Sequence, residues 1–324
     1  MNHDVLNVYL EPIRHLLTDE SVNEIIVNRP GEVWVEWDRK FERIDSDEFS
    51  AEHLRTLADL VASSTHQTVD ESTPLLSATL PDGCRAQFVL PPACPSDAFV
   101  MAVRRHRPLN FTLEDYEAAG AFDSVGKRTA KENDVHGHLS TLYKAGNISG
   151  FIRCAIENRV SCLISGGTST GKTTFLRTCL SLIPSKERLV LIEDVPEIFI
   201  EHDNVASLLY SRNDQGVANV TPQQLLEASL RLRPDRIILG ELRGNEAAAY
   251  LSAINSGHSG SITSVHADNP YMAYDKVAQL VMQSGMLMSK AEIIEYVKNI
   301  IPVVIQWDRE DDRLYVQDIY HAYA

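Results

Sequence analysis

An apolar stretch, a glycine-rich loop and a helical segment follow one another between residues 160 and 180. The loop reads GGTSTGKT at residues 166–173, which fits the spacing G-x-x-x-x-G-K-[ST] and directly follows the apolar run VSCLIS. Glycines let backbone N–H groups curl around phosphate oxygens, and the N-terminus of the next helix attracts negative charge. We therefore expect a strand–loop–helix unit that cradles the phosphates of a nucleotide.

Two side chains in this loop have specific expected tasks. Lys172 should neutralise the β and γ phosphates of ATP, and the Thr173 hydroxyl should ligate Mg²⁺. ATP and Mg²⁺ are therefore the expected ligands. The predicted nucleotide-binding residues are Gly166, Gly167, Thr168, Ser169, Thr170, Gly171, Lys172, Thr173 and Thr174.

The chain has 324 residues, which favours two domains. Residues 1–107 combine helical patterns at 5–17 and 50–62 with short strands at 23–28, 32–37, 75–80, 84–90 and about 98–104, so we predict an α+β domain. Residues 108–140 are polar and weakly periodic and are predicted to be a linker with short helices. Residues 141–324 alternate strands and helices, which predicts a mostly parallel sheet covered on both faces.

Composition excludes several classes of protein. A net charge of −15 disfavours general nucleic-acid binding and broad attachment to anionic lipid. The five cysteines form no CxxC pair, which disfavours a zinc site or a disulfide framework and suits a reducing cytoplasm. No apolar run approaches the roughly 18 residues of a membrane span, and the first residues lack a signal-peptide pattern. The run at 300–307, broken by Pro302, is predicted to be a buried strand.

Two further apolar strands are predicted to end in acidic residues. RLVLIEDVPEI ends in Glu193, Asp194 and Glu197, and DRIILGELRG carries Glu241 after Gly240. Open α/β sheets bind ligands at the carboxyl ends of their strands, where such acids hold Mg²⁺ through water or orient the attacking water. Glu241 is expected to be the base that polarises water or a ligand of Mg²⁺ through water. A solvated strand end is the alternative for each acid.

Two histidines lie in GHSGSITSVHA at residues 257–267. His266 is predicted at the carboxyl end of a short strand, where it could hydrogen-bond the γ-phosphate and respond to hydrolysis. His258 is expected either to hold the loop or to share that task.

These four segments, in this order, resemble the secretion ATPase superfamily: GGTSTGKT, IEDVPEI, ILGELRG and GHSGSITSVHA. Their wording is most similar to the VirB-eleven-like traffic ATPases of bacterial type IV secretion, over about residues 75–270. The resemblance implies an α/β fold with a RecA-like P-loop NTPase domain and a smaller N-terminal α+β domain. It also implies a hexameric ring that hydrolyses ATP to power assembly of, or substrate transfer by, a type IV secretion or conjugation system. The expected partners are further copies of the chain and inner-membrane components of the system, including its other ATPases, at the cytoplasmic face.

The resemblance also assigns roles to arginines. Arg85 in CRAQFVLPP and Arg104 in FVMAVRRH match family arginines that reach the nucleotide phosphates from the first domain. Arg105 leaves that choice open, because neighbouring residues of a strand point to opposite faces. Arg231 and Arg233 match a position near the subunit boundary, and Arg233 is expected to contact nucleotide. Ordinary surface ion pairing is the alternative for all of them.

Other functions share part of this pattern. A pilus assembly or retraction motor and a type II secretion ATPase have the same boxes, although the four-cysteine zinc module of many type II enzymes is absent from the sequence. A RecA-type nucleic-acid motor is disfavoured by the acidic charge. An ATP-regulated scaffold is disfavoured because both Lys172 and Glu241 are present. Because the boxes sit in one predicted domain and Arg85 and Arg104 in the other, we expect nucleotide turnover to move the domains, and the length of the linker leaves open which subunit's first domain covers which nucleotide.

Overall fold

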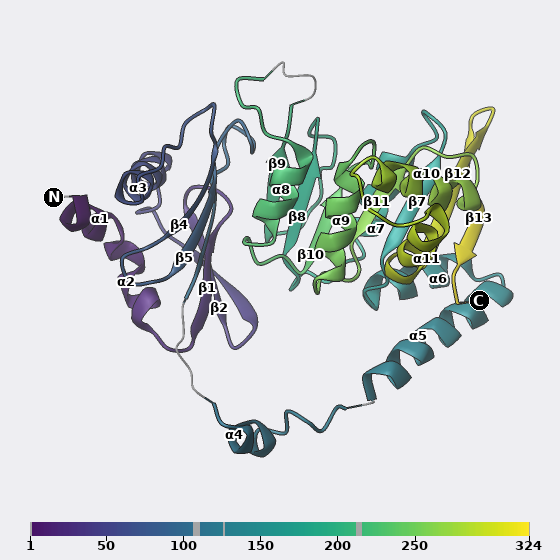
Figure 1. Cartoon of the computed structure of the whole chain (residues 1–324), viewed down its shortest axis with the longest axis horizontal. Coiled ribbons are helices and arrows are strands. Elements are labelled where there is room, and N and C mark those ends of the chain that lie inside the picture. The colour runs from purple at the N-terminus through teal and green to yellow at the C-terminus, as the bar shows by residue number, and fades with distance from the viewer. Residues whose placement is uncertain (1, 106–110, 126, 212–215, 324) are drawn as a thin grey trace.

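The computed structural model describes residues 2–105, 111–125, 127–211 and 216–323 and contains two β-sheets joined by a helical connection (Figure 1). The first sheet has the strand order β3-β2-β1-β6-β5-β4, and all its neighbouring strands are antiparallel. Its strands are β1 Val22–Val27, β2 Glu32–Trp37, β3 Lys40–Asp45, β4 Leu75–Thr79, β5 Arg85–Val89 and β6 Val100–Arg104.

The two faces of the first sheet belong to different hydrophobic cores. Ile25 and Val27 on β1 pack into a core with the N-terminal helices, whereas Ile26 between them packs into the core of the second sheet. Successive side chains of a strand point to opposite faces, so this sheet is covered on both sides. The helices on the Ile25 and Val27 face are α1 Asn2–Tyr9, α2 Glu11–Thr18 and α3 Ala51–Ser64.

The single helix predicted at residues 5–17 is wrong: the structure breaks it into α1 and α2 at Leu10. Pro12 explains the break, because proline has no amide hydrogen and is tolerated only in the first turn of a helix. The predicted strands match β1, β2, β4, β5 and β6 to within two residues at each end. The strand β3 was not predicted, since four of its six residues are charged.

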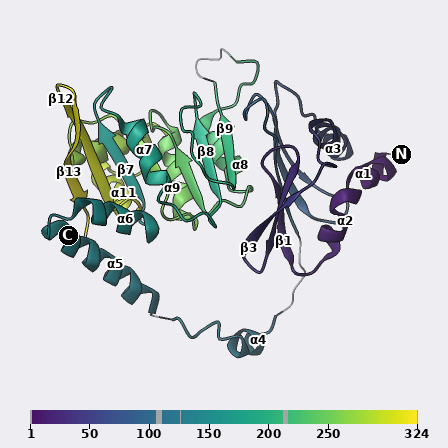
Figure 2. The same cartoon turned by 180° about the vertical axis from the view of Figure 1, so that it is seen from behind.

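The connection between the sheets contains α4 Leu113–Ala118 and α5 Lys127–Lys144. None of the residues of α4 is buried, and the helix lies clear of both sheets in both views (Figures 1 and 2). The helix α5 begins inside the stretch predicted as linker, and its Leu139 is fully buried in a core of the second sheet. That residues 1–107 and 141–324 form separate domains joined by a linker at 108–140 stays a prediction.

The second sheet has the strand order β13-β12-β7-β11-β10-β8-β9. All its neighbouring pairs are parallel except β12 with β13. Its strands are β7 Cys162–Gly166, β8 Leu189–Glu193, β9 Val205–Leu209, β10 Arg236–Leu239, β11 Ile262–Val265, β12 Val303–Glu310 and β13 Arg313–His321. The parallel sheet and the buried strand near residue 303 were predicted; β9 and β13 were not.

Helices cover both faces of the second sheet, as Figure 2 shows from behind. They are α6 Ile148–Glu157, α7 Lys172–Leu180, α8 Pro222–Ser229, α9 Glu246–Asn255, α10 Pro270–Met282 and α11 Lys290–Ile300. No helix in the described part of the chain is both long enough and apolar enough to cross a lipid bilayer.

The first sheet packs directly against the β8–β9 side of the second (Figure 1). The backbone amide of Leu209 on β9 donates to the carbonyl oxygen of Ala93 at 2.8 Å. The fully buried Arg188 at the start of β8 donates to Asn28 at 2.7 Å, and Asn28 donates to Asn204 at 3.1 Å. Apolar contact and buried polar pairing together make this contact resemble a protein interior rather than a loose domain boundary.

Candidate active site

The carboxyl ends of β7, β8, β10 and β11 meet at one edge of the second sheet, because these four strands are parallel neighbours. A cavity of about 440 Å³ opens there. It is lined by Thr168, Ser169, Thr170, Gly171, Lys172, Thr173, Thr174, Glu193, Asp194, Val195, Glu197, Ile198, Gly240, Glu241, Arg243, Ser264 and His266. The structure thus brings the predicted phosphate loop, acids and His266 together.

The loop needs glycine at two of its positions. A side chain at Gly166 would collide with the carbonyl oxygen of Trp307 and lie 2.8 Å from the Thr170 hydroxyl. Gly171 caps α7 with a φ of +84°, a left-handed conformation that other residues adopt only with strain. The next residue is Lys172, so the helix dipole and the lysine face the same cavity.

Lys172 is folded back onto its own loop. Its ammonium group donates to the carbonyl oxygen of Gly166 at 2.9 Å and to that of Gly167 at 2.5 Å. Burial lowers the pKa of Lys172, and the nearby charge of Glu241 opposes that shift. A buried cation that is held by carbonyl oxygens can gain energy by contacting a phosphate instead.

A continuous row of polar contacts crosses the cavity from the loop to the end of β8. The Lys172 ammonium lies 3.2 Å from Nδ1 of His266, and Nε2 of His266 lies 3.3 Å from Oε1 of Glu241. Oε2 of Glu241 lies 2.6 Å from the guanidinium of Arg243. The other end of that guanidinium lies 3.4 Å from Asp194. The row therefore links all four predicted sequence boxes.

The contact with Lys172 favours one tautomer of His266. Burial and the charge of Lys172 lower the pKa of His266, against a hydrogen bond with the backbone of Gly166, and so favour the neutral ring. Because the Lys172 ammonium can only donate, Nδ1 accepts and the ring proton resides on Nε2, facing Glu241. His266 can thus offer an N–H to an oxygen atom in the cavity.

The two acids after β8 have different surroundings. Oε1 of the buried Glu193 accepts the backbone N–H groups of Glu197 and Ile198 at 3.0 and 2.9 Å, which anchors the following loop. Burial raises the pKa of Glu193, against those two hydrogen bonds. Asp194 faces Arg243 instead. Glu193 therefore holds backbone as well as lining the cavity.

Two residues of this site were missed from the sequence. Arg243 bridges Glu241 and Asp194, and the buried Glu246 accepts the backbone N–H groups of Arg243 and Gly244 at 2.6 and 2.8 Å. The spacing Glu-Leu-Arg-Gly-Asn-Glu carried a signal, because an acid at the first turn of a helix often caps backbone amides. An arginine two residues after a strand-end acid gives no comparable signal.

The predicted arginines line a different cavity. In the described part of the chain, the residues that line the phosphate-loop cavity all lie between 168 and 266. Arg85 and Arg104 are directly paired neighbours on β5 and β6. With Arg159, Arg231 and Arg233 they line a second cavity of about 500 Å³, the arginine cavity. This cavity lies between the first sheet and the second domain, and Glu24 and His258 also line it.

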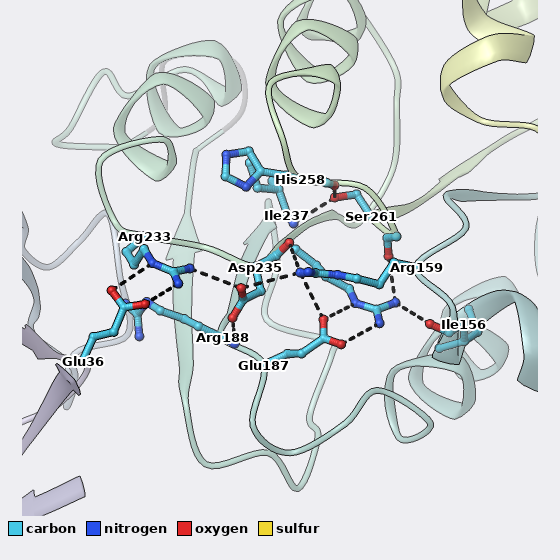
Figure 3. Close-up of polar contacts among 12 residues, drawn as sticks. Glu36, Ile156, Arg159, Glu187, Arg188, Arg233, Asp235, Ile237, His258 and Ser261 are labelled. Atoms are coloured by element: carbon cyan, nitrogen blue, oxygen red, sulfur yellow. Dashed lines mark hydrogen bonds and ion pairs between the residues drawn. The ribbon is translucent and has the colours of Figure 1, made fainter. Parts of the chain in front are cut away.

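Ion pairs hold Arg233 at the edge of this second cavity (Figure 3). Its guanidinium contacts the Glu36 carboxylate through two nitrogens, Nε and Nη2, and Asp235 through the third, Nη1, at 3.2 Å. Arg231 donates to the carbonyl oxygen of Glu227 at 3.1 Å. In the single chain Arg233 thus bridges the sheets and does not line the phosphate-loop cavity.

The sequence left open whether Arg104 or Arg105 reaches the nucleotide and whether His258 holds its loop. The geometry bears on both questions. Arg104 lines the arginine cavity, whereas the guanidinium of Arg105 lies on the carbonyl oxygens of Asp19 and Val22. Burial lowers the pKa of His258, and its carbonyl oxygen accepts the Ser261 hydroxyl at 2.7 Å. His258 is therefore placed in the loop before β11, away from the P-loop cavity lining.

A cluster of charged residues beside the second cavity joins the starts of β8 and β10 (Figure 3). Arg236 is fully buried and binds Glu187 with two nitrogens at 2.7 and 3.0 Å, and it also donates to the carbonyl oxygen of Ile156. Arg159 reaches Glu187 and Asp235 at 3.4 and 3.5 Å. These contacts hold in place the strands that end in Glu193 and Glu241.

The described residues contain no group of three or more His, Cys, Asp or Glu side chains arranged to hold a metal by themselves. The P-loop cavity instead offers the Thr173 hydroxyl and several carboxylates. Those are oxygen donors of the kind that Mg²⁺ uses when phosphates and water complete its shell. The residues present therefore fit a magnesium–nucleotide complex.

Comparison with known proteins agrees with the geometry. The family described as Type II/IV secretion system protein matches residues 7–302. The type IV secretion system protein VirB11 of Bartonella quintana is 36% identical over 325 residues, covering 96% of this chain and 91% of its own. VirB11 of Agrobacterium tumefaciens is 35% identical over 322 residues, covering 98% and 94%.

A solved structure resembles the whole chain. The crystal structure of the VirB11 ATPase from the Brucella suis type IV secretion system, in complex with sulphate, superposes with a TM-score of 0.91. The two chains are 33% identical, and the match covers 99% of this chain and 95% of that one. The chain therefore belongs to the type II/IV secretion system protein family and, within it, to the VirB11 ATPases of type IV secretion.

Proposed function

We propose that this chain hydrolyses ATP to ADP and phosphate in the P-loop cavity and thereby drives type IV secretion. The observation that carries the proposal is the row Lys172–His266–Glu241 across one cavity at the end of a glycine-rich loop. It combines a cation for phosphates, a neutral N–H donor and a carboxylate within hydrogen-bonding reach of one another.

Each side chain then has a defined task. Lys172 exchanges the carbonyl oxygens of Gly166 and Gly167 for β- and γ-phosphate oxygens. Glu241 orients a water and accepts its proton while the water oxygen bonds to the γ-phosphorus and the bond to the β-phosphate oxygen breaks. His266 donates a hydrogen bond from its Nε2–H group to a γ-phosphate oxygen. The Thr173 hydroxyl would hold Mg²⁺, which supplies additional neutralisation of the phosphate charge.

We further propose that the active unit is a closed homohexamer in which each nucleotide lies between two chains. The P-loop cavity lacks Arg85 and Arg104, which lie with Arg233 in the second cavity of the same chain. A head-to-tail ring brings different surfaces of neighbouring copies together. It can therefore set the arginine cavity of one chain against the P-loop cavity of the next, where arginine stabilises the charge of the transition state.

The moving junction in this scheme lies between chains. The first sheet and the ATPase domain of one chain share an apolar core and the buried Arg188–Asn28 contact. In this proposal they therefore move together, which departs from the motion between domains expected from the sequence. Loss of the γ-phosphate removes contacts with the arginines of the neighbouring chain. Because ATP and ADP then differ in their contacts, hydrolysis weakens the interface between the two chains. In this proposal the connection at 108–140 lets the first domain pack against the ATPase domain of its own chain.

Protein contacts are the proposed route to the membrane. A net charge of −15 disfavours direct attachment to anionic lipid or to nucleic acid. All five cysteines are free thiols, as expected in the cytoplasm. We propose that the ring works at the cytoplasmic face of the inner membrane on other components and ATPases of the secretion system.

Phosphate release from ATP by the purified chain tests this function. Lys172→Ala should lower turnover by about 10²- to 10³-fold and weaken ATP binding by about tenfold or more, because a buried triphosphate loses its main counter-charge. Lys144→Ala, at the exposed end of α5, is the control and should leave both unchanged. Wild-type turnover in Lys172→Ala would defeat the assignment of the site.

A further inference from the structure

Arg243 lines the P-loop cavity and has no role in the mechanism above. It lies two residues beyond Glu241 in the turn between β10 and α9. One end of its guanidinium lies 2.6 Å from Glu241 and the other lies 3.4 Å from Asp194. It therefore ties the acid that follows β10 to the acid that follows β8.

The backbone beneath Arg243 is fixed. Glu246 is buried at the first turn of α9, and one of its oxygens accepts the amide protons of Arg243 and Gly244 at 2.6 and 2.8 Å. Leu242 is buried and its amide donates to the carbonyl oxygen of Ser264. The turn therefore holds the backbone of Arg243 beside Glu241, and the carboxylates of Glu241 and Asp194 hold its guanidinium.

The charge balance of the cavity gives this contact importance. Among the described residues that line the cavity, the carboxylates are Glu193, Asp194, Glu197 and Glu241, and the cations are Lys172 and Arg243, with His266 neutral. Without Arg243, the Glu241 carboxylate would share the cavity with three other acids and an incoming triphosphate, and Lys172 would be the remaining cation of the described lining. Like charges that share a cavity favour protonation of one carboxylate, and a protonated Glu241 accepts no proton from water.

We propose that Arg243 is the positioning residue of the proposed base: it keeps Glu241 ionised and aimed across the cavity at His266, and Asp194 holds its guanidinium in place. This inference rests on the proposed role of Glu241 in hydrolysis. In this role Arg243 acts through Glu241.

The test compares steady-state ATP hydrolysis between pH 5 and 9 for the wild type, Arg243→Gln, Arg243→Lys, Asp194→Asn, Glu241→Gln and the double variant Arg243→Gln/Glu241→Gln. Arg243→Gln should lower kcat by about 10- to 100-fold, more than it raises KM, and should move the acid limb of the kcat profile up by about one pH unit. Arg243→Lys should return the acid limb to its place, since it keeps the charge, but should restore only part of kcat, since an ammonium cannot bridge two carboxylates as guanidinium does.

Two further comparisons separate this role from a merely structural one. In the Glu241→Gln background, Arg243→Gln should produce no further loss, because the group through which it acts is already gone. Asp194→Asn should give a smaller loss in the same direction as Arg243→Gln. Arg153→Gln is the control: Arg153 forms an exposed ion pair with Glu157 on α6, and its loss should change neither kcat nor the pH profile.

The outcomes are distinguishable. Wild-type kcat and an unmoved acid limb in Arg243→Gln, together with an inactive Glu241→Gln, would overturn this inference and leave the proposed function standing. An equal fractional loss from Arg243→Gln with and without Glu241 would also overturn it. Wild-type turnover in Glu241→Gln would remove the proposed base and this inference with it.

Discussion

Glu36 on β2 and Arg233 before β10 form a two-point ion pair that joins the first sheet to the ATPase domain. Glu36 is buried and Arg233 is about one-third exposed. The contact sets the position of the arginine cavity on the chain that carries it. The sheet that bears Arg85 and Arg104 contributes no residue to the described lining of the same chain's P-loop cavity.

Loss of this pair should loosen the junction. Glu36→Gln removes the charge and leaves Arg233 with Asp235 alone, so the free energy of unfolding should fall by about 1–3 kcal/mol. Urea denaturation measures it. Glu42→Gln, at an exposed position on β3, should change the value by less than about 0.5 kcal/mol. Equal stability of the two variants would mean that the pair contributes nothing to the junction.

Glu24 predicts a dependence of stability on pH. Burial raises its pKa from 4.5 to about 7, against the opposing charge of Arg104. Between pH 4.5 and 7 the folded chain therefore binds a proton that the unfolded chain has released, so stability contributed by this site is present below pH 4.5 and is lost as pH rises to about 7.

Glu24→Gln removes this titration. We subtract the free energy of unfolding of the wild type from that of the variant at each pH. This difference should be larger at pH 8 than at pH 4.5 by about 1–3 kcal/mol. Urea denaturation at the two pH values gives the comparison. The same difference between variant and wild type at both pH values would show that Glu24 titrates alike in the folded and unfolded chain.

Glu241→Gln should separate binding from hydrolysis. The amide keeps the size of the side chain and loses its basicity, so a fluorescent ATP analogue should bind within about threefold of wild type while phosphate release falls by about 10²- to 10⁴-fold. Glu227→Gln, exposed on α8, should retain both activities. Loss of nucleotide binding in Glu241→Gln would make that side chain structural and would move the role to Glu193 or Asp194.

The sequence predicted the site better than its surroundings. Lys172, Glu241 and His266 could be placed together because strand order and carboxyl ends follow from alternating apolar strands and helices. Arg243 could not, because its partner Asp194 is 49 residues away and the pair forms only when β8 and β10 become neighbours. The same limit applies to Arg233, whose partner Glu36 lies on another sheet.

The position of Arg85 and Arg104 was the least accessible to sequence reasoning. The sequence placed each of them on a predicted strand, and only the structure shows that they are paired neighbours on β5 and β6. The local sequence pattern does not indicate against which side of the second sheet the first sheet packs. That choice is made by dispersed contacts such as Arg188 with Asn28 and the shared apolar core around Ile26 and Trp34.

Subunit mixing tests the composite site most directly. Lys172→Ala has a disabled P-loop and intact arginines, whereas Arg85→Ala/Arg104→Ala has the reverse, and each alone should be inactive as a folded ring. If one chain's arginines serve the next chain's nucleotide, equal mixtures should recover about a quarter of the wild-type rate per chain, because about one interface in four combines the two intact halves. Mixtures no more active than the separate variants would contradict the account, since a site completed within one chain cannot be repaired by a neighbour.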